Sequence, residues 1–175
     1  MRREARFFVY ALVVVFAIGL QRPYTTNAAD PKTGTWSGGG AIGFLADTPD
    51  GTALALNLNL DYFLNRDVSV GPLFQLAATG DLSQVGFSGQ GKFWIDLPGV
   101  EHRAKLTLQG GIGFLHADLV EPDTSWLIPV GIGLDYKLNP KISLTTTFLL
   151  NFTDIDTGRR KDAHVMPGLT FGVRF

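Results

Sequence analysis

The stretch ALALNLNLDYFLN, residues 53–65, alternates apolar and polar side chains almost without interruption. Leucine or tyrosine occupies its even positions, whereas Asn57, Asn59 and Asp61 occupy odd positions between them. Successive side chains of a β-strand point to opposite faces of the sheet, so this alternation predicts a strand with one apolar and one polar face.

The same period of two recurs along the rest of the chain. It is clearest at residues 126–138, 142–152 and 165–175, and weaker at 34–46, 68–78, 85–97 and 104–116. Together with residues 53–65, these segments predict an all-β fold of eight strands.

The connections between these segments alternate in character. Residues 65–67, 98–103 and 139–141 are short, whereas 47–52, 79–84, 117–125 and 154–164 are longer and richer in Asp, Thr, Gly and Pro. Tight turns at one end and longer loops at the other are typical of a closed antiparallel outer-membrane barrel. Residues 60–70 also reappear, in part, as residues 134–144, a spacing that four plus four strands would produce.

The N-terminus has the pattern of a secretory signal peptide. Arg2, Arg3 and Arg6 precede an apolar run over residues 7–20, and the segment ends in small residues at 28–29. This run is short for a membrane-spanning helix, which needs about 20 residues. We therefore expect residues 1–29 to be a cleaved signal peptide and residues 30–175 to form the exported barrel.

The composition excludes several classes of function. The chain has no cysteine, so disulfide scaffolds, thiolate metal sites and cysteine nucleophiles are absent. Its formal net charge of -1 provides no basic field for nucleic acid. No Glu, His and Asp spacing matches a metal site, and we expect no cofactor.

Alternation alone does not tell which face of the barrel points outward. A soluble lipocalin-like barrel would enclose its apolar face around a ligand, whereas a membrane barrel would turn it toward lipid. The glycines favour the membrane barrel, because most share the polar parity, where they would relieve crowding inside a narrow barrel. These inward glycines are Gly39, Gly43, Gly71, Gly86, Gly111, Gly113, Gly131, Gly133, Gly168 and Gly172.

The end of the chain carries a resemblance to a known family. Phe171, Val173 and Phe175 share the apolar face of the last predicted strand, and aromatic residues Trp36, Tyr62, Trp126 and Tyr136 fall where two interfacial girdles should lie. In these features residues 30–175 resemble the eight-stranded outer-membrane barrels, the OmpA-like and OmpX-like proteins. The resemblance implies integral outer-membrane localisation. It also implies recognition of the last strand, ending in Phe175, by the barrel-assembly machinery.

The inward face should carry a layer of charges near the short-turn end. Six residues of the polar parity form this predicted layer: Asp61, Asp96, Lys105, Asp135, Lys137 and Arg174. Unpaired charges in so narrow a space would be costly, so they should pair with one another. Above them we expect neutral hydrogen-bonding groups and a polar plug; the alternative is a narrow gated pore.

Trp94 lies on the inward parity, where its indole N–H needs an acceptor such as Asp96. We expect instead that a local bulge turns its ring toward the membrane interface.

Catalytic patterns are sparse. His116, Asp118 and Ser125 share one predicted loop, and Asp162 and His164 share another, which leaves a lipid-modifying enzyme as an alternative. We expect a monomeric structural or surface-interacting protein whose partners are outer-membrane lipid and lipopolysaccharide.

Deletion of Phe175 should impair assembly, because the family resemblance makes this residue part of the assembly signal. Heat-modifiable gel migration of the envelope fraction measures this, since a folded barrel and an unfolded chain migrate differently. Normal amounts of heat-modifiable protein after the deletion would contradict the prediction.

Overall fold

The computed structural model describes residues 33–98, 103–158 and 163–175. The predicted signal peptide, residues 1–29, lies outside the described residues. The strands are β1 (Trp36–Thr48), β2 (Gly51–Phe63), β3 (Val68–Ala78), β4 (Ser83–Asp96), β5 (Ala104–Asp118), β6 (Asp123–Asn139), β7 (Ile142–Ile155) and β8 (Ala163–Arg174). The described residues contain no helix long and apolar enough to cross a membrane, a result that does not bear on spans made of strands.

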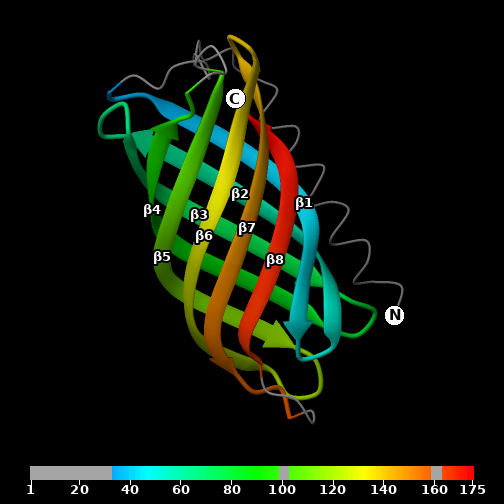
Figure 1. Cartoon of the computed structure of the whole chain (residues 1–175). Helices are drawn as coiled ribbons and strands as arrows, with labels where there is room; N and C mark the ends of the chain where they lie inside the picture. The colour runs from blue at the N-terminus through cyan, green and yellow to red at the C-terminus, as the bar shows by residue number, and fades with distance from the viewer. Residues whose placement is uncertain (1–32, 99–102, 159–162) are drawn as a thin grey trace, which may run out of the picture.

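The eight strands form one closed antiparallel barrel in sequence order, which confirms the predicted fold. Each strand pairs with the next, and β1 pairs with β8 from Gly39–Arg174 to Leu45–Gly168. Figure 1 shows the strongly tilted strands, with the C-terminus at the same end as the β2–β3 and β6–β7 connections. We call this the turn end and the opposite end the loop end.

The observed strands extend further toward the loop end than the alternation predicted. β5 continues to Asp118, β6 begins at Asp123 and β7 continues to Ile155. Inward side chains such as Ala117 and Ile155 are fully buried there, so these segments are held by interior packing as well as by backbone pairing. The connection between β5 and β6 is correspondingly short.

The turn chemistry explains the internal repeat. Asn65 and Asn139 occupy equivalent positions after β2 and at the end of β6. The side-chain oxygen of Asn65 accepts a hydrogen bond from the Asp67 N–H, and that of Asn139 accepts bonds from the Lys141 and Ile142 N–H groups. Each asparagine therefore stabilises a tight turn in the way that Asx turns do.

The apolar face of the sheet points outward in all eight strands. One large apolar side chain from each strand, at least 38% exposed, illustrates this: Phe44, Leu54, Val70, Phe87, Ile112, Ile132, Phe148 and Leu169. An apolar belt of this extent is incompatible with a water-soluble monomer and suits contact with lipid. The soluble lipocalin-like alternative is therefore wrong, because the large side chains of the alternating apolar face point away from the interior.

Several inward glycines lie where the neighbouring strand leaves no room for a side chain. A Cβ at Gly43 would collide with the Leu169 carbonyl oxygen, and one at Gly113 with that of Phe87. The outward glycines Gly89 and Gly91 have open space beside them instead. This difference supports the assignment of the glycine-rich face to the interior.

Replacement of Ile132 by Arg should lower the free energy of unfolding by about 2–4 kcal/mol in lipid vesicles. Ile132 is 44% exposed near the middle of β6, so the guanidinium would face hydrocarbon. The matched control is Val120→Arg, since Val120 is exposed in the loop between β5 and β6 and should tolerate a charge. Denaturant titration of both variants measures the difference; equal stabilities would contradict the outward assignment.

Candidate functional site: a charged layer in the barrel interior

A layer of charged side chains crosses the barrel interior near the turn end. Lys105 on β5 is in register with Asp96 on β4 and with Asp135 on β6, so three charges of alternating sign lie side by side. The period of two directs all three toward the interior at the same level.

Three carboxylates in this layer each pair with a cation. Arg174 holds Asp135 in a fork, with Nε to Oδ2 at 2.7 Å and Nη2 to Oδ1 at 2.9 Å. The Lys92 ammonium lies 2.9 Å from Asp61, and the Lys105 ammonium 2.6 Å from Asp96. Since Asp61 is fully buried and Asp135 only 4% exposed, these pairs compensate charges that would otherwise be very costly to enclose.

Arg174 is the most connected member of the layer. Besides Asp135, its guanidinium donates hydrogen bonds to the hydroxyls of Ser37 on β1 and Ser143 on β7. It also lies 5.1 Å from the centre of the Trp94 ring on β4, a cation–π contact. One side chain therefore joins four strands in addition to its own.

The prediction that a local bulge turns the Trp94 ring toward the membrane interface is wrong. The Trp94 side chain points inward and is only 2% exposed, and no bulge interrupts the pairing of β4 with β5 at this position. The indole N–H donates to the Ser69 hydroxyl at 2.9 Å rather than to Asp96, and the ring packs against Phe63. Ser69 on β3 is small enough to leave room for the ring, and its hydroxyl accepts the indole hydrogen bond. The sequence pattern of β4 alone does not reveal this neighbour.

The layer differs in two members from the predicted set. Lys137 lies half-buried at the turn-end mouth and forms no ion pair with any described residue. Lys92 is not among the six predicted members, but its long side chain reaches Asp61, which also accepts a bond from the Asn59 amide. The alternation along β4 places Lys92 on the inward face, but only the structure shows in which direction its side chain extends along the barrel axis.

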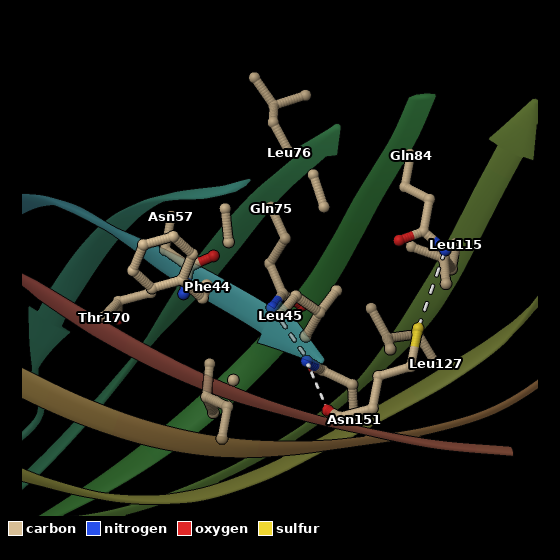
Figure 2. Close-up of a pocket in the computed structure, with 15 residues that line it drawn as sticks. Phe44, Leu45, Asn57, Gln75, Leu76, Gln84, Leu115, Leu127, Asn151 and Thr170 are labelled. Atoms are coloured by element: carbon tan, nitrogen blue, oxygen red, sulfur yellow. Dashed lines mark hydrogen bonds between the residues drawn. The ribbon is translucent and has the colours of Figure 1, made fainter. Parts of the chain in front are cut away.

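Amide side chains occupy the middle of the barrel above the charged layer. In Figure 2, Gln75 from β3 and Asn151 from β7 meet across the interior, with Gln75 Nε2 donating to Asn151 Oδ1 at 3.3 Å. Two small cavities lie among these interior side chains, one of about 20 Å³ near Gln84 and Asn151 and one of about 40 Å³ beside Lys92 and Arg174.

An apolar cap fills the interior at the loop end, where the sequence analysis expected neutral polar groups. This cluster comprises Leu45, Ala53, Ala55, Ala77, Leu82, Leu115, Ala117, Leu127, Ile155, Ala163 and Met166. Figure 2 shows Leu45, Leu115 and Leu127 directed toward one another beside Gln84. The signal was present in the sequence, because these strand ends are apolar on both parities.

The histidines and serine near the loop end do not form a catalytic group. His116 Nδ1 lies 2.8 Å from the Thr124 hydroxyl, whereas Ser125 accepts a bond from the Asp154 N–H. Ser125 is in register with the inward-facing Leu115, so its side chain and that of His116 leave opposite faces of the sheet.

The second predicted loop group is likewise not assembled. His164 lies 3.2 Å from Asp154, and both side chains are exposed. Asp118 is exposed, and Asp162 lies outside the described residues. Across the part of the chain that is described, no group of three or more His, Asp or Glu residues is placed to hold a metal ion.

The predicted girdle and terminal residues lie on the outer wall. Trp36 and Tyr62 pack together at the turn end with ring centres 4.9 Å apart, and Tyr136 is also exposed there. Trp126 is exposed toward the loop end. Phe171, Val173 and Phe175 all point outward, as the lipid-facing parity of β8 requires.

Comparison with known proteins identifies the fold. No protein-family model matches the sequence, and no curated protein matches it either. Among solved structures, the N-terminal β-barrel domain of Pseudomonas aeruginosa OprF is similar, with 15% identity and a TM-score of 0.58 over 83% of this chain and 100% of that chain.

Two further barrels show the same likeness. Neisserial surface protein A has 16% identity and a TM-score of 0.59, covering 79% of this chain and 94% of its own. Ail, the attachment invasion locus protein of Yersinia pestis, has 16% identity and a TM-score of 0.54, covering 80% and 96%. The chain is thus an eight-stranded barrel of the outer-membrane type.

Replacement of Lys92 by Met should lower the free energy of unfolding by about 3–5 kcal/mol, because it leaves the fully buried Asp61 without its cation. The control Lys141→Met removes an exposed cation in a turn and should change stability by about 0.5 kcal/mol or less. Adding Asp61→Asn to Lys92→Met should recover part of the loss. Denaturant titration in detergent measures all three, and equal stabilities of the two single variants would count against the layer.

Proposed function

We propose that this barrel is an integral outer-membrane protein with a sealed interior and a structural or surface-interaction role. The observation that carries the proposal is the combination of a continuous apolar outer belt with an interior filled by side chains. A belt of this kind matches a lipid environment, and a filled interior leaves no path for a solute.

The packing of the interior supports a plug rather than a pore. The apolar cap closes the loop end, and the three ion pairs cross the barrel at the turn end. The two cavities between them, of about 20 and 40 Å³, have room for only a few water molecules. An ion would have to cross a dry segment and a paired charge layer, and both carry high desolvation costs.

The outer surface supports the proposed partners. Outer-membrane lipid would contact the belt, and lipopolysaccharide would surround the loop end. The barrel-assembly machinery would recognise the outward side chains of Phe171, Val173 and Phe175. We propose that the mature protein acts as a monomer, as a closed barrel leaves no strand edge to pair with another copy.

The geometry near the loop end favours a non-enzymatic role. A lipid-modifying enzyme would need a nucleophile within hydrogen-bond reach of its base. Here His116 and Ser125 lie on opposite faces of the sheet, which argues against that pairing. Mass spectrometry of lipid A from cells with and without the protein tests this: an unchanged profile is expected, and a new acylation or phosphorylation state would overturn the non-enzymatic part of the proposal.

Planar bilayers containing the purified barrel should show no stepwise ionic current, while a known open porin in the same bilayers should conduct. Reproducible steps would overturn the sealed interior but not the membrane location. The location has its own test, because the protein should remain with the outer-membrane fraction and need detergent for release. Recovery in a detergent-free periplasmic extract would overturn it.

A further inference from the structure

The contact between β1 and β8 closes the barrel and has little backbone length to define its alignment. It is in register from Gly39–Arg174 to Leu45–Gly168, with two further backbone hydrogen bonds between Gly38 and Phe175. The β4–β5 contact is longer and extends from Ser83–Asp118 to Asp96–Lys105. β1 is also rich in glycine, and glycine-rich strands specify their pairing register weakly. Some other feature must therefore select the alignment.

The inward residues of this closing contact are complementary in size. Four facing pairs point into the barrel, and each joins one glycine to a larger residue: Gly39–Arg174, Ala41–Gly172, Gly43–Thr170 and Leu45–Gly168. The fit is close. A Cβ on Gly172 would collide with Ala41 and with the Gly40 carbonyl oxygen, and one on Gly168 would lie 3.2 Å from the Leu45 side chain.

A slip of two residues preserves the inward and outward faces but destroys this complementarity. In one direction Gly39 would face Gly172 and Gly43 would face Gly168, while Leu45 would meet Met166. Two glycine pairs would leave voids, and two large buried side chains would compete for one space. The opposite slip places Gly43 against Gly172, which leaves one void, and Leu45 against the buried Thr170, which places two side chains in one space.

Arg174 fixes the turn end of the same contact. Its guanidinium is held by Asp135 and Ser143 on the β6–β7 side of the contact, and it donates to Ser37 on β1 at 3.2 Å. Ser37 in turn donates to the Phe175 carbonyl oxygen at 3.0 Å. A slip of two residues would move Ser37 about 7 Å along β1 and break both bonds in the barrel interior.

We propose that the glycine-to-large pairs between β1 and β8, together with the hydrogen bonds of Arg174 to Ser37 and Asp135, select the register in which the barrel closes. Register at this contact sets the shear of the whole barrel, and with it the strand tilt and the interior width. The pairs therefore determine whether the cap and the charged layer can form.

The register can be read with thiol pairs, because the chain contains no cysteine. Leu169→Cys is combined with Phe44→Cys, its partner in the structure, or with Ile42→Cys or Ala46→Cys, its partners after a slip of two residues in either direction. Leu169, Phe44 and Ile42 are exposed on the outer wall, so the probes leave the interior unchanged. A short thiol cross-linker is applied to the full chain folded in lipid vesicles.

The variants exchange the two members of one pair. Gly168→Leu alone places two leucines against each other, and it should reduce the Leu169–Phe44 cross-link by about tenfold or more, through slippage or failure to fold. Leu45→Gly with Gly168→Leu restores one glycine and one leucine with the sides reversed. This double variant should fold and recover the Leu169–Phe44 cross-link to within about twofold of the parent.

Arg174→Met tests the other part of the proposal and should add cross-links to Ile42 or Ala46. The proposal is overturned if Gly168→Leu folds with an undiminished Leu169–Phe44 cross-link. It is equally overturned if the double exchange does no better than Gly168→Leu, whether or not either variant folds. An Arg174→Met barrel with only the parent cross-link would remove Arg174 from the mechanism.

Discussion

The pairing of every backbone N–H and C=O within the sheet is the requirement on which the rest of this structure depends. Hydrocarbon offers these groups no water, so a sheet in lipid must close on itself and leave no edge. Eight strands close around a space barely wide enough for side chains. The close approach at Gly43 and Gly113 follows directly, because a backbone bent into so narrow a barrel leaves no volume for a Cβ at these positions.

The narrow interior also explains its division into three chemical levels. Charges persist at the turn end because Asp61, Asp135 and Asp96 each have a cation within ion-pair distance. Amides bridge the middle, and the loop end packs like the core of a water-soluble protein. The outer wall is apolar at all of these levels. Inward side chains are therefore selected by their fit to other side chains, and outward side chains by their contact with lipid.

Much of this architecture could be predicted from the sequence because a period of two is a local property. Residues 53–65 alone indicate a strand with two unlike faces, and the glycine parity indicates which face lies inside. The positions of Asp61 and Asp135 within the charged layer followed from the same alternation. What parity does not encode is the path of a side chain along the barrel axis. The alternation therefore did not predict that Lys92 pairs with Asp61, or that Lys137 forms no ion pair with any described residue.

Trp94 and the apolar cap were missed because they depend on neighbours in other strands. Trp94 fits inside only because Ser69 is small and provides an acceptor, and Ser69 lies on β3. The cap depends on the strand ends meeting at one level, which requires the register of all eight strands. The strand ends that form the cap are apolar on both parities, but local alternation does not tell that they meet at one level or that Ser69 lies beside Trp94.

Because the cap is built almost entirely from strand residues such as Leu45, Leu115, Leu127 and Met166, the seal lies beneath the connections rather than within them. In the sealed barrel that we propose, the connections at the loop end would have no part in closing the interior. Under the proposed function, substitutions and insertions in these connections would leave the closure of the interior unchanged.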